Sequence, residues 1–198
     1  MDLKGVVALV TGGNGGLGQR ICHALAQEGA HIAVVYARSR EQAEGVASEL
    51  ASRYQVNAHA FGCDLTDGAA VDQLVGEVTK TFGRLDILIN DAAYNHAIPF
   101  ADLDNLTPEV WNRIMATNLT GPMLLTKAVA PIMKAQGRGR IINIASVARA
   151  QPNRLFYRLC RVEGGAHSSD ALHGGGASAR DARQLRGTGS AGRHPRDR

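Results

Sequence analysis

The chain has 198 residues, 44% of them hydrophobic, which is enough for one domain with a buried core. Its 22 basic and 18 acidic side chains give a net charge of +4, but nine arginines and only four acidic residues lie from position 153 onward, so residues 1–152 are nearly neutral. Nucleic-acid binding by this main part is therefore not favoured, and no apolar run approaches the roughly 20 residues of a membrane span.

The cysteine and histidine pattern gives no metal site. Cys22, Cys63 and Cys160 lie far apart and form no CxxC pair, and the seven histidines lack metal-ligand spacing. The first residues, MDLKG, contain no apolar signal-peptide region. We therefore expect reduced thiols, no metal and a cytoplasmic protein.

A glycine-rich turn follows the first apolar run. The run Val6 to Val10 predicts a buried strand, and an amphipathic pattern from Leu17 to Glu28 predicts a helix. Between them stands TGGNGGLG, residues 11–18. Glycines in a strand–turn–helix context let the backbone approach a pyrophosphate, and the helix N-terminus then faces the anion. A tight turn that binds nothing is the alternative.

Apolar runs and helical patterns alternate along the next 120 residues. We expect strands over residues 31–36, 57–63, 85–90 and 139–145, and helices over residues 40–54, 67–82 and 107–135. Thr107 caps the last helix, and Pro108 takes its first position. This alternation predicts an α/β fold with a Rossmann-type, doubly wound parallel sheet, truncated to about five strands.

Five motifs appear in a recognisable order. They are TGGNGGLG at residues 11–18, Asp64-Leu65 after the third strand, NDAA at residues 90–93, Asn118 in the long helix, and Ser146 after the fifth strand. Together they resemble the short-chain dehydrogenase/reductase family over about residues 3–152. Within the family the pattern looks most like the 3-oxoacyl-carrier-protein reductases. We therefore expect residues 1–152 to form an incomplete dinucleotide-binding domain and residues 153–198 a separate tail.

The resemblance implies a nicotinamide dinucleotide site. The residues that it places there are Thr11, Gly12, Asn14, Gly16, Leu17, Gly18, Tyr36, Arg38, Ser39, Asp64, Leu65, Asn90 and Ala92. No carboxylate stands at the end of the second strand to hold a ribose hydroxyl, and Arg38 offers a fork for a 2′-phosphate. We therefore expect NADP(H). A solvated Arg38 and a turn-forming or helix-capping Asp64 are the alternatives.

The NDAA segment departs from the family's usual NNAG. Asp91 replaces an asparagine and Ala93 a glycine. A carboxylate beside the dinucleotide is expected to weaken its binding, and a Cβ at position 93 to tighten the approach to the cofactor.

The resemblance also implies hydride transfer between nicotinamide and a carbonyl or alcohol. Ser146 would hydrogen-bond the reacting oxygen, Asn118 would hold a water, and a tyrosine with a lysine four residues later would exchange the proton. The chain has Tyr157, but Arg161 stands in place of the lysine, and Tyr157 lies two positions closer to Ser146 than the family spacing of thirteen. Arginine differs from lysine in shape and hydrogen bonding.

The tail lacks the expected family sequence. From Arg158 onward only four large apolar residues occur, which predicts a disordered segment. Codons for Asn153 onward, read one nucleotide out of phase, permit the missing YxxSK helix and a VNxVAPG strand and loop. We interpret this as a one-nucleotide frameshift near Pro152 or Asn153, arising in the gene or in its sequencing; a genuine basic tail is the alternative.

Three functions follow from these patterns. The first is an NADP(H)-dependent oxidoreductase whose proton-donating pair is lost, acting on a small carbonyl or alcohol that is free or attached to a carrier protein. The second is a dinucleotide-binding module without turnover. The third is an interaction protein whose Arg/Gly tail contacts anionic partners. The family forms homo-oligomers, but a helix of the usual interface is missing, so the oligomeric state stays open.

Overall fold

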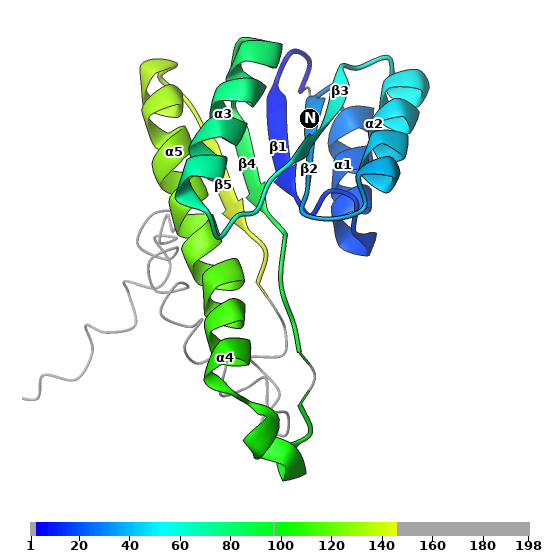
Figure 1. Cartoon of the computed structure of the whole chain (residues 1–198). Helices are drawn as coiled ribbons and strands as arrows, with labels where there is room; N and C mark the ends of the chain where they lie inside the picture. Colours follow the sequence, from blue (N-terminus) through cyan, green and yellow to red (C-terminus); the bar gives the residue numbers. More distant parts are fainter. Residues whose placement is uncertain (1–2, 97, 146–198) are drawn as a thin grey trace, which may run out of the picture.

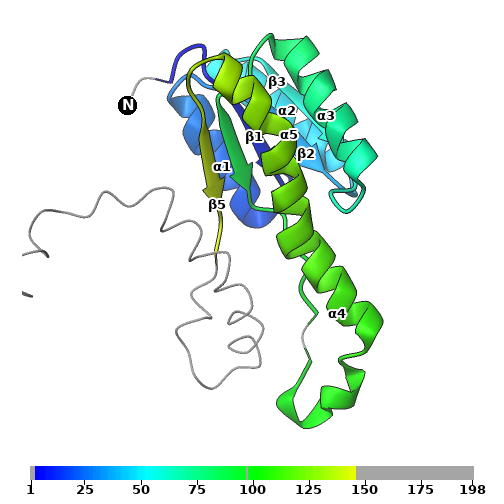
Figure 2. The same cartoon turned by 90° about the vertical axis from the view of Figure 1, so that its left-hand side faces the viewer.

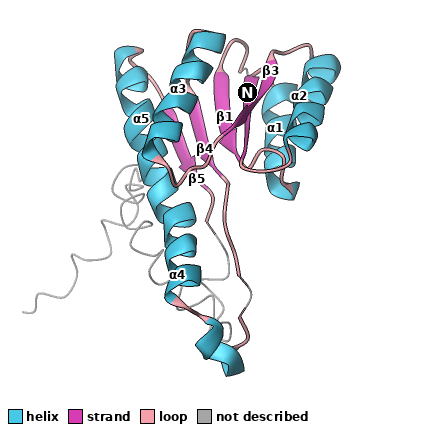
Figure 3. Ribbon diagram, viewed as in Figure 1, coloured by secondary structure: helices cyan, strands magenta, loops and turns pink. Residues whose placement is uncertain are grey.

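The computed structural model describes residues 3–96 and 98–145, which form a parallel sheet between two layers of helices (Figures 1 and 3). Five strands in this part of the chain have the order β3-β2-β1-β4-β5. They are β1 (Val7–Thr11), β2 (His31–Tyr36), β3 (Ala58–Gly62), β4 (Ile87–Asn90) and β5 (Arg140–Asn143). The predicted α/β doubly wound sheet is thereby confirmed.

Helices cover both faces of the sheet. The helices are α1 (Gly16–Gln27), α2 (Arg40–Tyr54), α3 (Gly68–Phe82), α4 (Pro108–Met115) and α5 (Gly121–Ala135). Figure 1 shows α1 and α2 on one side of the sheet and α3 and α5 on the other, while α4 extends beyond the sheet (Figure 2). No helix in residues 3–96 or 98–145 is both long and apolar enough to span a membrane.

The core explains why the strands read as continuous apolar runs. Successive residues of β1 point to opposite faces, and both faces are covered. Ala8 and Val10 pack with α1 and α2, whereas Val7 and Leu9 pack with α3 and α5. All four side chains are at most 1% exposed.

Most of the expected helix and strand boundaries lie within two residues of the observed ones. Two features of the structure were not expected. The predicted helix over residues 107–135 contains a π-helical turn at Ala116–Thr120, which separates α4 from α5. A 3-10 segment, Phe100–Asn105, was not predicted. The cap at Thr107 is present, because its side chain accepts the Val110 N–H at 3.4 Å.

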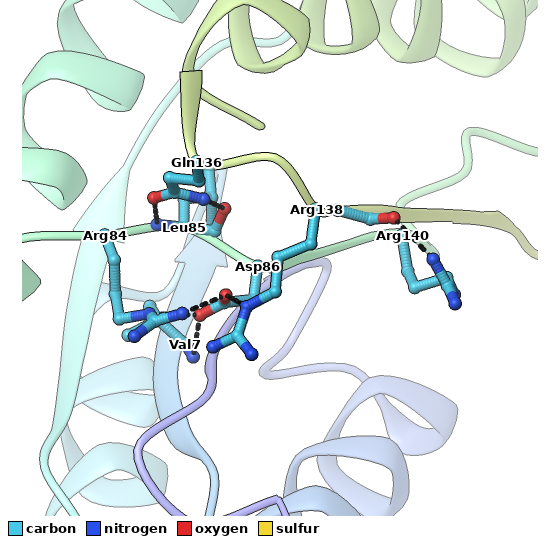
Figure 4. A network of polar contacts seen from close by, with 8 residues as sticks. Val7, Arg84, Leu85, Asp86, Gln136, Arg138 and Arg140 are labelled. Carbon is cyan, nitrogen blue, oxygen red and sulfur yellow. Dashed lines mark hydrogen bonds and ion pairs between the residues drawn. The ribbon is translucent and has the colours of Figure 1, made fainter. Parts of the chain in front are cut away.

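A carboxylate ties the amino ends of the central strands together (Figure 4). Asp86, immediately before β4, accepts the Val7 N–H at 3.0 Å and two hydrogen bonds from Arg84 at 2.6 and 2.7 Å. Arg138 adds an ion pair at 3.3 Å. Burial alone would raise the pKa of Asp86, but these hydrogen bonds and charges leave it below its ordinary value.

Candidate functional site

The strand order reverses between β1 and β4, and we call the space outside the carboxyl ends of these two strands the crevice. The chain runs from β1 outward to β2 and β3, then returns to the other side of β1 for β4 and β5. In open α/β sheets, ligands bind outside the carboxyl ends of the strands where the order reverses. The loops after β1 and β4 therefore line the candidate site.

The glycine turn after β1 is packed too tightly for side chains at two positions. Gly12 has φ +65°, and a Cβ there would stand 3.0 Å from the Ala92 Cα. A Cβ on Gly18 would collide with the Gly12 carbonyl oxygen. These glycines bring the first turn of α1 directly over the end of β1 and against the loop after β4.

The amino end of α1 is open to an anion. Gly15, its N-cap, provides no side-chain cap, and the first turn, which includes Leu17, carries no acidic residue. A Cβ on Gly16 would meet no heavy atom of the described residues within 4 Å. The free N–H groups of a helix's first turn favour a phosphate, so the turn fits the pyrophosphate of a dinucleotide.

Thr11 joins the two loops of the crevice. Its hydroxyl donates to the Ile89 carbonyl at 3.3 Å and accepts the N–H groups of Asp91 and Ala92, each at 3.0 Å. Thr11 is only 1% exposed. Its hydroxyl therefore positions the loop after β4, and any contribution to ligand binding is made through that loop.

Asn14 joins the glycine turn to the end of β2. Its Nδ2 donates to the Arg38 carbonyl at 3.2 Å. Arg38 and Ser39 are exposed, and Ser39 adopts φ +60° before α2 begins. The Tyr36 ring lies against Gly62, where an added Cβ would stand 3.1 Å from the phenol oxygen. The structure thus brings together four of the predicted residues at the expected 2′-phosphate end: Asn14, Tyr36, Arg38 and Ser39.

Asp64 forms a turn at the end of β3. One oxygen accepts both the Thr66 hydroxyl at 2.7 Å and the Thr66 N–H at 2.9 Å, and these hydrogen bonds lower the pKa of the carboxyl. The turn-forming alternative is therefore present, and the helix cap is Asp67 instead. Leu65, the next residue, is buried and packs on Gly121 at the start of α5.

Asn90 links the carboxyl ends of β4 and β5. Its Nδ2 donates to the Asn143 Oδ1 at 2.8 Å. The Asn90 Oδ1 is buried and has no hydrogen-bond partner among residues 3–96 and 98–145. An unsatisfied acceptor at this edge fits a site completed by a hydroxyl or amide donor of a ligand.

Asn118 lies in the π turn and is bonded to the loop after β4. Its Oδ1 accepts the Tyr94 N–H at 2.8 Å, and its Nδ2 donates to the Tyr94 carbonyl at 3.0 Å. Arg113 of α4 stacks over the Tyr94 ring, 4.1 Å from the centroid. Ser146 and Tyr157, as well as the tail, lie outside the described residues, and so does the predicted boundary at position 152.

Sequence reasoning missed Tyr94, Arg113 and Asn143 as structural partners of the site. Asn143 stands three residues before Ser146 in an apolar strand, which is the one signal that could have drawn attention to it. The stacking of Arg113 on Tyr94 joins residues 19 positions apart in different elements, and no local pattern reports it.

One family model and several known proteins match this chain. Residues 6–157 match the family described as short chain dehydrogenase. D-threitol dehydrogenase of Mycolicibacterium smegmatis is 40% identical over 147 residues, 74% of this chain and 54% of that protein. A 3-oxoacyl-(acyl-carrier-protein) reductase of Staphylococcus aureus is 36% identical over 150 residues, 74% of this chain and 58% of that protein.

Solved structures give the same result. An NAD⁺-bound xylitol dehydrogenase superposes with a TM-score of 0.71 and 33% identity, covering 78% of this chain and 58% of that one. A metagenomic short-chain oxidoreductase in complex with NADP superposes with a TM-score of 0.67 and 34% identity, covering 73% of this chain and 64% of that one. The chain thus spans little more than half the length of the curated relatives described here.

Proposed function

The chain belongs to the short-chain dehydrogenase family of oxidoreductases, and we propose that it binds NADP(H) in the crevice between β1 and β4. The observation that carries this proposal is the uncapped amino end of α1, held open beside the loop after β4. The pyrophosphate would contact the first turn of α1. The adenosine half would extend toward Asp64 and Leu65, and the nicotinamide half toward Asn90 and Ala92.

The preference for NADP(H) over NAD(H) is supported by the end of β2. Residues 36–39 contain no carboxylate, and the exposed Arg38 offers five N–H donors to a 2′-phosphate. The bond from Asn14 to the Arg38 carbonyl holds this turn against the glycine turn. Among the solved relatives one holds NAD⁺ and another NADP, so the choice rests on the residues of this chain.

The proposed reaction is reduction of a carbonyl, or oxidation of an alcohol, on a small substrate such as a 3-oxoacyl group attached to a carrier protein. The nicotinamide supplies the hydride when bound. Ser146 would hold the reacting oxygen, and Tyr157 would exchange its proton. Arg161 cannot reproduce the hydrogen bonding of a lysine beside that tyrosine. Loss of an effective general acid lowers rates by about 10²–10⁴-fold, so we propose that this chain turns over poorly or not at all.

Cofactor binding is the direct test. Fluorescence titration of the full chain should give at least about tenfold tighter binding of NADPH than of NADH, which corresponds to ~1.4 kcal/mol. Arg38→Ala should remove this difference by weakening NADPH alone. Arg53→Ala, an exposed arginine near the other end of α2, is the matched control. Equal affinities in the parent chain contradict the NADP(H) preference, and failure to bind either cofactor contradicts the dinucleotide site.

Turnover is tested separately. Reduction of a 3-oxoacyl thioester by the full chain should be barely above background, and Tyr157→Phe should lower the residual rate further. Equal residual rates in the parent and in Tyr157→Phe would exclude Tyr157 as the proton donor. NADPH binding with no measurable reduction favours the second candidate function, a dinucleotide-binding module. Its support is that Arg161, and not a lysine, stands four residues after Tyr157 in the sequence.

A further inference from the structure

Asp91 lies at the point where the strand order reverses. It directly follows Asn90, the last residue of β4, and β4 pairs with β1. Its N–H donates to the Thr11 hydroxyl at 3.0 Å, so the backbone of Asp91 is fixed to the end of β1. The backbone of Asp91 is thereby held at the carboxyl end of β4, next to the glycine turn, where Gly12 lies against Ala92.

The Asp91 side chain has no compensating partner. It is half-buried and makes no hydrogen bond or ion pair with the described part of the chain. Burial raises the pKa of the carboxyl above its ordinary value, and no charge or hydrogen bond opposes that shift. Burial of an ionised carboxyl in this position costs free energy by itself, and a second anion beside it raises that cost.

The charge of Asp91 acts on a side chain of α1. Burial, followed by the charge of Asp91, raises the pKa of the Cys22 thiol in the second turn of α1 to about 12. Cys22 is the titratable group on α1 that interacts with Asp91, and it stays neutral over the physiological range. Thr11, the contact from β1, does not titrate. Neither Cys22 nor Thr11 therefore offsets the negative charge of the Asp91 carboxylate.

We propose that Asp91 sets dinucleotide affinity: its carboxylate, on a backbone fixed beside the glycine turn, opposes the cofactor phosphates. This inference rests on the proposed dinucleotide site. Phosphates bound at the first turn of α1 would lie beside the loop that Asp91 begins, because Gly12 of the glycine turn lies against Ala92. At an effective dielectric of about 20, like charges about 10 Å apart lower an equilibrium constant by roughly tenfold.

The test compares the full chain with Asp91→Asn, which keeps the shape and removes the charge. NADP⁺ affinity is measured by calorimetry at pH 8. The variant should bind about tenfold tighter than the parent, because it lacks the charge that opposes the cofactor phosphates.

Controls make each outcome decisive. Asp72→Asn, which changes an exposed aspartate of α3, should match the parent. Asp91→Ser, a second neutral variant, replaces Asp91→Asn if the latter fails a thermal-melting check. Equal or weaker binding by the neutral variants at pH 8 overturns the role of Asp91 while the dinucleotide site stands. Absence of NADP⁺ binding in every protein overturns the proposed function itself.

Discussion

Replacing Thr11 by valine removes the hydroxyl that joins the ends of β1 and β4. Valine has nearly the same shape, so the core around position 11 stays filled. The substitution leaves the N–H groups of Asp91 and Ala92 without their acceptor and the Ile89 carbonyl without its side-chain donor. Since Thr11 is 1% exposed, water cannot replace the hydroxyl at that position without rearrangement.

The cost follows from the number of groups that lose a partner. A buried donor or acceptor left without a hydrogen bond costs about 1–3 kcal/mol. Asp91 and Ala92 are only partly buried, so water recovers part of this cost. We expect Thr11→Val to lower the free energy of unfolding by about 2–4 kcal/mol. Thr11→Ser keeps the hydroxyl and should lose only about 1 kcal/mol, for one buried methyl group.

Urea unfolding of the full chain measures the difference. Thr79→Val is the matched control: its hydroxyl bonds the Val75 carbonyl at 2.7 Å within α3, where the helix already supplies a partner. If Thr11→Val is no less stable than Thr11→Ser or Thr79→Val, the hydroxyl does not hold the two loops together.

The remaining predictions concern the glycine turn and Asp86, which lies at the amino ends of the central strands β1 and β4. Gly18→Ala should abolish NADP⁺ binding and lower the melting temperature, because its Cβ collides with the Gly12 carbonyl, whereas Gly16→Ala should fold normally and weaken only the binding measured by calorimetry. Asp86→Asn should lower the free energy of unfolding by about 2–3 kcal/mol at pH 7, since it leaves the Arg84 fork without its anion. Because the folded-state pKa of Asp86 is depressed, its stabilisation is present at neutral pH and is lost as the pH falls through that pKa. The difference between the variant and the parent in urea unfolding should therefore shrink as the pH is lowered toward the folded-state pKa of Asp86.

Strands and helices were predictable wherever one local pattern determined them. The runs His31–Tyr36 and Arg40–Tyr54 were placed without error, because a buried parallel strand and an amphipathic helix each leave a periodic signal. Strand β5 was predicted too long, as residues 139–145. Its ladder is limited by β4, which pairs only from Ile87 to Asn90. Strand length is thus set by the partner, which lies some 50 residues away.

The π turn has a local signal as well as distant contacts. Residues 107–135 have a helical pattern, but Gly121 and Pro122 directly follow positions 116–120, and proline lacks the N–H that would continue the regular helical hydrogen bonds. The turn coincides with two distant contacts, the amide of Asn118 on Tyr94 and the approach of Gly121 to Leu65. Most of the candidate site was predictable, because its glycines and polar residues follow strand ends. Thr11 was predicted as a residue of the cofactor site, whereas its hydrogen bonds to the loop after β4 could not be predicted, because those partners lie about 80 positions further on.

Asn118 bears on both parts of the proposed function, dinucleotide binding and turnover. Both groups of its amide are engaged by the backbone of Tyr94, so the side chain fixes the loop after β4. The amide keeps one N–H and one lone pair, either of which could bind a water. The contacts that build the crevice between β1 and β4 all lie before position 146, whereas Ser146 and Tyr157, which would act on a substrate oxygen, lie at position 146 and beyond. In the proposed function, dinucleotide binding and turnover would thus depend on different parts of the chain, and a loss of the second would not require a loss of the first.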